Sequence, residues 1–340
     1  YSSGTVRTGD YGLFRQNLKS PCQAVPLSCG TVQSRKLAHP AKIDTYTYTA
    51  AANDAIRLQV FRNTAGLALE MELYLPNGLL WERDTGSIIS TRLPNAGLYT
   101  LFIYTNNIIT DGEYRLGFQK AKGACNATPL VACQTLRTSI GQQAEMDAYT
   151  FDSPGSGVAV LRLEGQTSQF AAGDLKGEIY TPDGISLGTF SSGSAKVVGL
   201  AQVGVYTVLV YSSPSTGMIG NYTLSLGNPT VTLLTPNGGE LAWAGQPLSV
   251  SWESADYQSG SSLAGHEVRL STDGGASFPT VLTSSLSASA KTFTWDVPVN
   301  LVATRGRLRV VARNNLNATC QDDSDSDFFI IARPELKKTT

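Results

Sequence analysis

Short apolar runs alternate with polar residues along most of the chain, at the period of a β-strand. Residues 56–60 and 112–118 alternate strictly, so each predicts a strand with one face toward a core. Residues 99–104 are apolar on both faces, which predicts a central strand. No segment combines a helical apolar stripe with capping residues. Many short strands separated by Gly, Pro and Asn predict an all-β chain built from antiparallel sandwiches.

The same train of signals occurs twice, about 100 residues apart. The offset between copies drifts from 103 residues at Asp44 to 107 at Gly97, as short loop insertions produce. About 100 residues can bury a core alone, so the repeat is a tandem domain rather than a solenoid unit. The matched stretches are 44–48 with 147–151, the turn 72–78 with 178–184, and 93–99 with 200–206.

The repeat divides the chain into three modules with an extension at each end. We call the three modules one, two and three. The predicted ranges are an N-terminal arm or linker at 1–20, module one at 21–120, module two at 121–227, module three at 228–333 and a polar, basic tail at 334–340.

Composition excludes some classes of partner but does not identify a function. Only 16% of the 340 residues are charged, and 26 Lys and Arg balance 27 Asp and Glu. This balance excludes nucleic acid and anionic membrane as main partners on electrostatic grounds. No apolar run reaches the roughly 18–20 residues that span a bilayer. The chain begins at Tyr1 without a signal peptide, so we expect a processed product or a fragment.

The cysteines predict an oxidising, extracytoplasmic compartment. Cys22 and Cys29 occupy the same places in the first repeat as Cys125 and Cys133 in the second. Zinc sites need closely spaced ligand pairs and four donors, and the chain has only two histidines. We therefore predict local disulfides, Cys22–Cys29 and Cys125–Cys133, each worth about 2–3 kcal/mol. Cys320 has no counterpart in the repeats, which leaves it as a buried thiol or an intermolecular partner.

Modules one and two resemble bacterial pre-peptidase C-terminal domains, which are jelly-roll-like sandwiches of secreted peptidases and other surface proteins. About 200 residues are covered. Some relatives bind calcium, and Asp174, Glu70 and Glu72 fall near the acidic positions of that pattern; we predict no cofactor there. The resemblance is carried by Asp44, Tyr46 and Tyr48 with Asp147, Tyr149 and Phe151, by Leu73-Tyr74-x-Pro76-Asn77-Gly78 with Ile179-Tyr180-x-Pro182-Asp183-Gly184, and by Gly97-x-Tyr99 with Gly204-x-Tyr206.

Module three resembles the immunoglobulin-like or fibronectin-type-III-like modules of secreted bacterial proteins, over about 105 residues. Trp252 and Trp295 are expected to fill the space between its two sheets, because each buries a large area. The other matching stretches are 235–240, Trp243, Gly245, 268–275, 293–298, 308–312 and 325–331.

Candidates for chemistry are few, and each has a structural interpretation. Residues 271–278 resemble an Asp-box hairpin, which we interpret as a turn. The acidic run 322–327 could bind calcium but lacks the spacing of an EF-hand, so we interpret it as a solvated turn. His39 and His266 lie in predicted loops without a GxSxG or HExxH motif. We predict no enzyme, no catalytic residue and no metal site. Three glycosylation sequons, at Asn126, Asn221 and Asn317, are interpreted as chance occurrences.

The expected function is an extracellular structural one. The arm is either a linker or a strand donor whose anchors are Val6, Tyr11, Leu13 and Phe14, since an added strand binds through main-chain hydrogen bonds. The second possibility favours a self-assembling fibre or cell-surface layer, a homopolymer joined end to end. Two alternatives remain: spacer or substrate-anchoring modules of a secreted peptidase or hydrolase, and an adhesin for glycan or matrix protein.

Overall fold

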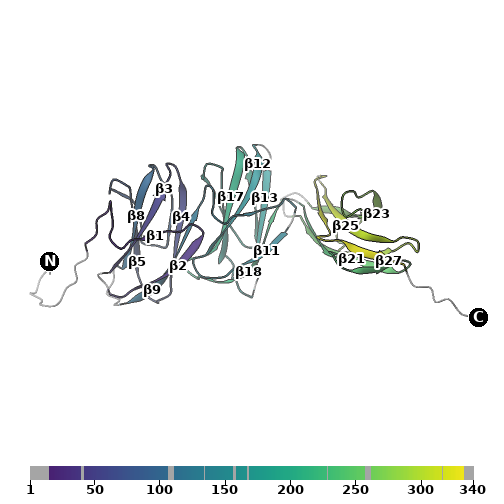
Figure 1. Ribbon diagram of the computed structural model, residues 1–340, viewed down its shortest axis with the longest axis horizontal. Coiled ribbons are helices and arrows are strands. Elements are labelled where there is room, and N and C mark those ends of the chain that lie inside the picture. The colour runs from purple at the N-terminus through teal and green to yellow at the C-terminus, as the bar shows by residue number, and fades with distance from the viewer. Residues whose placement is uncertain are drawn as a thin grey trace, which may run out of the picture.

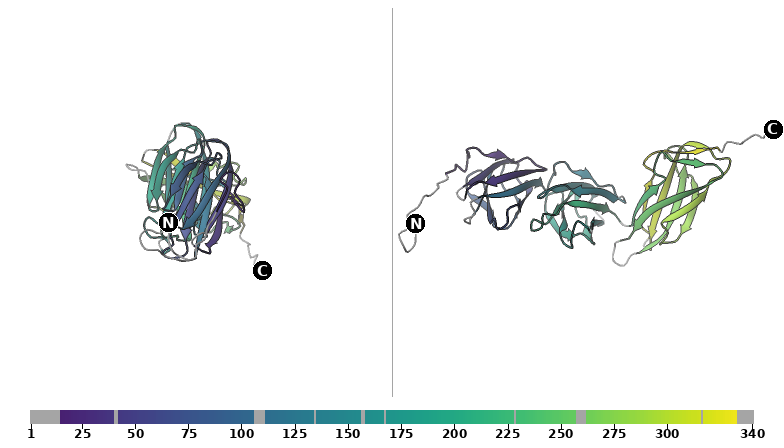
Figure 2. Two further views of the ribbon diagram at one scale, coloured as in Figure 1. Left: turned by 90° about the vertical axis from the view of Figure 1, so that its left-hand side faces the viewer. Right: turned by 90° about the horizontal axis from the view of Figure 1, so that it is seen from below.

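The structure is a computed structural model that describes residues 15–39, 42–105, 111–133, 135–155, 158–166, 168–227, 229–256, 262–315 and 317–332. The three sandwiches follow one another along a single long axis, with modules one and three at opposite ends (Figure 1). The strands of module three run at a clear angle to those of the first two modules (Figure 2). The predicted all-β sandwich class is confirmed. The predicted arm anchors Val6, Tyr11, Leu13 and Phe14 lie outside the described residues.

Module one is a sandwich of a five-stranded sheet, in the order β1-β3-β8-β5-β6, and a four-stranded sheet, in the order β2-β9-β4-β7. Leu58 and Val60 on β4 face Met71 and Leu73 on β5 within one buried cluster between the two sheets. The strands are β1 (Val25–Pro26), β2 (Thr31–Leu37), β3 (Ile43–Ala50), β4 (Ala55–Arg62), β5 (Leu69–Tyr74), β6 (Leu80–Asp84), β7 (Ile88–Arg92), β8 (Gly97–Thr105) and β9 (Gly112–Lys120).

Module two repeats this plan, with sheets in the orders β10-β12-β17-β14-β15 and β11-β18-β13-β16. Even the short parallel pairing recurs, since Val25 lies opposite Tyr46 and Thr128 lies opposite Tyr149. The strands are β10 (Thr128–Pro129), β11 (Thr135–Ile140), β12 (Met146–Pro154), β13 (Val158–Gly165), β14 (Leu175–Tyr180), β15 (Ser186–Ser191), β16 (Ser194–Gly199), β17 (Val203–Ser212) and β18 (Gly220–Leu226).

Module three packs a three-stranded sheet, β19-β21-β24, against a sheet in the order β20-β27-β25-β22-β23, to which β26 adds beside β25. Trp252 and Trp295 lie in its buried cluster, as the sequence predicted. The strands are β19 (Thr230–Thr235), β20 (Leu241–Trp243), β21 (Pro247–Ala255), β22 (Leu263–Ser271), β23 (Thr280–Leu286), β24 (Thr292–Asp296), β25 (Ala303–Asn314), β26 (Thr319–Asp323) and β27 (Phe328–Ile331).

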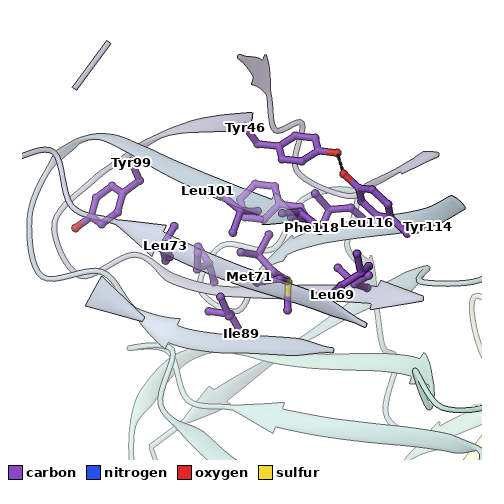
Figure 3. Close-up of a cluster of buried hydrophobic side chains, with 14 of the residues drawn as sticks. Tyr46, Leu69, Met71, Leu73, Ile89, Tyr99, Leu101, Tyr114, Leu116 and Phe118 are labelled. Atoms are coloured by element: carbon purple, nitrogen blue, oxygen red, sulfur yellow. Dashed lines mark hydrogen bonds between the residues drawn. The ribbon is translucent and has the colours of Figure 1, made fainter. Parts of the chain in front are cut away.

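The repeated aspartate-headed strand anchors a buried hydrogen-bond chain in each repeat. In module one Tyr114 donates to Asp44 at 2.7 Å, and its hydroxyl lies 2.6 Å from that of Tyr46. Figure 3 shows the two tyrosines meeting at one side of the apolar cluster. In module two Tyr222 donates to Asp147 at 2.6 Å and contacts Tyr149 in the same way. Buried polar groups need such partners, so the duplicated stretch ties β3 to β9 and β12 to β18 across each sandwich.

The Asp147 chain predicts a pH dependence. Burial, which outweighs the hydrogen bond from Tyr222, raises the pKa of the Asp147 carboxyl from 3.8 to about 6. Folded module two therefore keeps a proton that the unfolded chain releases, so the contribution of Asp147 to its stability is greatest below about pH 4 and falls as pH rises through 6. Asp147→Asn should remove this fall, which is at most about 3 kcal/mol. Hydrogen exchange of β12 and β18 at pH 4 to 7 measures it; equal slopes for both proteins would refute the assignment.

Candidate functional site

The outer face of one sheet of module one is covered by module two. Along β4, Ile56, Leu58 and Val60 point into the core, whereas Arg57 and Gln59 point the other way. Although they lie on the face away from their own core, Arg57 and Gln59 are only 3% and 0% exposed. They are buried because the four-stranded sheet of module one stacks on the five-stranded sheet of module two.

A buried ion pair lies at the centre of this first joint. The Arg57 guanidinium lies 2.8 Å from the Glu178 carboxylate, and their side chains are 4% and 9% exposed. The same guanidinium lies 4.0 Å from the ring centroid of Tyr211. Burial raises the pKa of Tyr211 to about 12, so at neutral pH its hydroxyl is a neutral donor 3.4 Å from Glu178. Beside them Gln59 donates to the carbonyl of Ser212 at 3.0 Å. The pair is thus held by β4 on one side and by β14 and β17 on the other.

Small residues let the two sheets approach closely around this pair. A methyl group on Gly117 would come within 1.9 Å of the Ala144 carbonyl oxygen, and one on Gly217 within 2.1 Å of the Phe61 ring. Backbone contact of this kind leaves no room for a side chain. The joint also has its own apolar cluster, made of Ala55, Ala121, Met146, Ala148, Tyr180, Leu209 and Tyr211.

A disulfide crosses the same joint. Cys29 follows β1 in module one, and Cys125 lies in the segment that leads into module two; they are bonded with their Cα atoms 5.7 Å apart. The Gln119 side chain at the end of β9 holds Cys125 in place. It donates to the Cys125 carbonyl at 3.1 Å and accepts from the Cys125 amide at 3.0 Å.

A second disulfide joins module two to module three. Cys133 is bonded to Cys320, 187 residues further along, with the Cα atoms 5.2 Å apart. Cys320 is 5% exposed and belongs to the core cluster of module three. Beside this bond the second joint has an exposed ion pair rather than a buried one. Its described ion pair, Arg137 with Glu253, has side chains that are 58% and 63% exposed.

These two bonds correct the predicted local pairing. Cys22–Cys29 and Cys125–Cys133 do not form, because each second cysteine of a repeat reaches forward to the next module. Cys320 is neither a thiol nor an intermolecular partner, since it holds Cys133. Among the five cysteines, all in the described part of the chain, only Cys22 is free, and it is exposed.

The other candidates are structural. Asp273 accepts from the Ser277 amide at 3.0 Å and from the hydroxyls of Ser271 and Ser277, so 271–278 is a turn. Each carboxylate of 322–327 has its own partner: Asp322 the Leu233 amide, Asp323 Arg309, Asp325 Asn237, and Asp327 Arg307. Within the described residues no three His, Cys, Asp or Glu side chains gather in a way that could hold a metal.

The two histidines have different surroundings. His266 is packed 5.3 Å from Trp252, with one ring nitrogen 2.7 Å from the Ser254 hydroxyl and the other 3.0 Å from the Ser287 carbonyl. Burial lowers the pKa of His266, which favours the neutral ring. His39 is exposed beyond β2. Among the described residues no helix has the length and apolar character needed to cross a bilayer.

Removing one partner of the buried pair should weaken the first joint. Arg57→Ala leaves Glu178 buried without its cation, which costs about 3–5 kcal/mol. Arg137→Ala is the matched control at the second joint, where an exposed pair is worth about 1 kcal/mol or less. Hydrogen exchange in β4 and β14 during denaturant unfolding measures both. The double variant Arg57→Met with Glu178→Met should recover most of the loss; equal effects of Arg57→Ala and Arg137→Ala would contradict the assignment.

The disulfide pattern can be read directly. Peptide mapping without reduction should give one cross-linked peptide pair containing Cys29 and Cys125 and a second containing Cys133 and Cys320. In the folded 340-residue chain Cys22 should be alkylated, because its side chain is exposed and no cysteine of this chain is left to pair with it. A peptide bridged between Cys22 and Cys29 would show instead that the local pairing holds.

No protein-family model matches the chain, and no curated protein matches it. Solved structures resemble parts of it. The pre-peptidase C-terminal domain of a collagenase from Bacillus anthracis is 21% identical, covers 29% of this chain and 98% of its own, and has a TM-score of 0.26. Fibronectin(III)-like modules of CbhA from Clostridium thermocellum are 17% identical, with 31% and 97% covered and a TM-score of 0.22. At such low scores the architecture rests on the strand order of this chain itself.

Proposed function

We propose that the chain is a non-catalytic structural rod of an extracellular assembly, in which three sandwiches are held at fixed spacing and orientation. The observation that carries this proposal is the placement of the disulfides. Each described bond joins two modules, and none lies within a module.

A bond within a module and a bond between modules have different physical effects. The first stabilises one fold, whereas the second restricts how two folds move against each other. Modules in one chain normally move relative to one another unless their interface is large and apolar. The described ion pair of the second joint is exposed, so the Cys133–Cys320 bond supplies a constraint that this pair does not. Joints fixed by disulfides suit a protein that must hold the two ends of its chain at a constant distance.

The compartment follows from the same bonds. Disulfides persist in oxidising surroundings, outside the cytoplasm. Cys320 is buried in the core of module three, where reductants have little access. We propose an extracellular or cell-surface location for the rod.

The use we propose for the rod is a fibre or surface layer, formed by end-to-end self-association. Exposed apolar side chains on module one support this use: Leu79, Leu80 and Trp81 are 64%, 45% and 40% exposed. Patches of this kind mark contact surfaces. A spacer that carries a hydrolase domain and an adhesin for glycan or matrix protein would need the same stiffness, and they are the competing outcomes of the experiment below.

Small-angle scattering and electron microscopy test the rod and its assembly separately. The oxidised chain should give a single extended shape. A variant with Cys133→Ser and Cys320→Ser should give a broader spread of angles between modules two and three, because the disulfide that joins these modules is absent. A flexible oxidised chain would refute the rod. Concentrated protein that shows only isolated rods in micrographs would refute the fibre and leave the spacer and the adhesin.

A further inference from the structure

The first repeat carries, ahead of its own first strand, a sequence that belongs to the end of such a module. Residues 9–22 match residues 112–125 at a constant offset of 103. In module one this matched stretch contains the last strand, β9 (Gly112–Lys120), and then Cys125. The identical or similar pairs are Gly9 with Gly112, Asp10 with Glu113, Tyr11 with Tyr114, Leu13 with Leu116, Gln16 with Gln119, and Cys22 with Cys125.

The described part of this stretch repeats the local geometry as well. Gln16 donates to the Cys22 carbonyl at 2.7 Å and accepts from the Cys22 amide at 2.8 Å. These are the same two bonds by which Gln119 holds Cys125. Thr100 on β8 donates to the Leu18 carbonyl at 3.0 Å, so the segment lies over the five-stranded sheet of module one. Leu18 corresponds to Ala121, which is buried in the first joint.

The sheet beneath it carries counterparts of Glu178 and Tyr211, the two residues of module two that contact Arg57. Strand registers align Glu72 with Glu178 and Tyr104 with Tyr211, since Glu72 lies opposite Phe102 as Glu178 lies opposite Leu209. Glu72 is 5% exposed and accepts from Tyr74 at 2.5 Å and from Tyr104 at 3.0 Å. Glu72 forms its ion pair with Arg83 of the edge strand β6, and the Arg83 side chain is 54% exposed. In module two the equivalent carboxylate instead binds the buried Arg57 of the preceding module.

We propose that the outer face of the five-stranded sheet of module one is a docking face for a further sandwich module of the same repeat. That module brings an arginine to Glu72 and a cysteine to Cys22, as module one brings Arg57 to Glu178 and Cys29 to Cys125. The inference rests on the proposed function, because it names the partner at the first module's end of the rod. It goes beyond that function by fixing the contact.

A second copy of the chain cannot be this partner through its own module one, because the Arg57 face there is already covered by module two. The sequence of residues 9–16 points to the alternative: another repeat whose last strand is this stretch. The covalent step is balanced by thiol–disulfide exchange. The two thiols lose two protons and two electrons to the disulfide of an oxidant thiol-disulfide protein or of oxidised glutathione, and form one bond.

A chimera tests the docking. A second copy of residues 23–111 is placed directly before Gly9 of the full chain, so that 9–16 can serve as its last strand and it contributes an added Cys29 and an added Arg57. After oxidation by oxidised glutathione, peptide mapping should find Cys22 joined to the added Cys29. Glu72→Gln should lower the effective concentration of this pair in a glutathione buffer by about tenfold or more, and the neighbouring Glu82→Gln should leave it unchanged.

Three results would overturn the proposal: both cysteines remaining open to alkylation in the chimera, Cys22 pairing with Cys22 of a second chain, or equal effects of Glu72→Gln and Glu82→Gln. If hydrogen exchange shows that the added module is unfolded, the test is instead peptide mapping of disulfides in the protein isolated from its natural source. There Cys22 must be bonded to a cysteine from sequence ahead of residue 9, and a free thiol refutes the docking. Failure of the docking would leave the scattering shape of the 340-residue chain intact, so the two proposals fail separately.

Discussion

A charged side chain that becomes buried between two sheets must be paired, and this requirement governs how the first two modules stack. Arg57 projects from β4 away from its own core and reaches Glu178 across the joint. Each charge is expensive to bury without the other, so the modules must stack in the one arrangement that brings the two charges together. The close backbone contacts at Gly117 and Gly217 and the Cys29–Cys125 bond then fix the geometry in which the two charges meet. Stability and orientation therefore have one common origin here.

The second joint is held by different interactions from those of the first. Arg137 and Glu253 remain largely in solvent, where an ion pair contributes little and is screened by salt. The Cys133–Cys320 bond closes a loop of 187 residues and ends in the core of module three. Its contribution is a restriction on movement that the exposed ion pair does not supply. The rod thus has one joint set mainly by buried contacts and one set mainly by a covalent bond.

The sequence predicted what depends on local pattern and misassigned what depends on neighbours. Alternation indicated the strands, and Trp252 and Trp295 fill the core of module three as their size requires. Alternation placed Arg57 and Gln59 on the face away from the core, but a period of two does not tell whether water or another module covers that face. The local cysteine pairing was wrong for a related reason: nearness in sequence was used where position in the repeat was the better guide. The matching of Glu178 with Glu72, and of Cys125 with Cys22, is the sequence signal that marks the docking face.

The repeat also explains why the series of similar modules stops at module two. Strand registers place Val160 of β13 where module one has Arg57, because Leu161 pairs with Leu226 as Leu58 pairs with Phe118. Arg162 takes the place of Gln59 and is bound to Glu164 on its own strand. The outer face of the four-stranded sheet of module two therefore has no arginine at the position from which Arg57 reaches the buried carboxylate of Glu178. A different module follows, and the forward-reaching cysteine, Cys133, is the part of the joint that is kept. The change of module type and the loss of the buried pair therefore occur at the same joint.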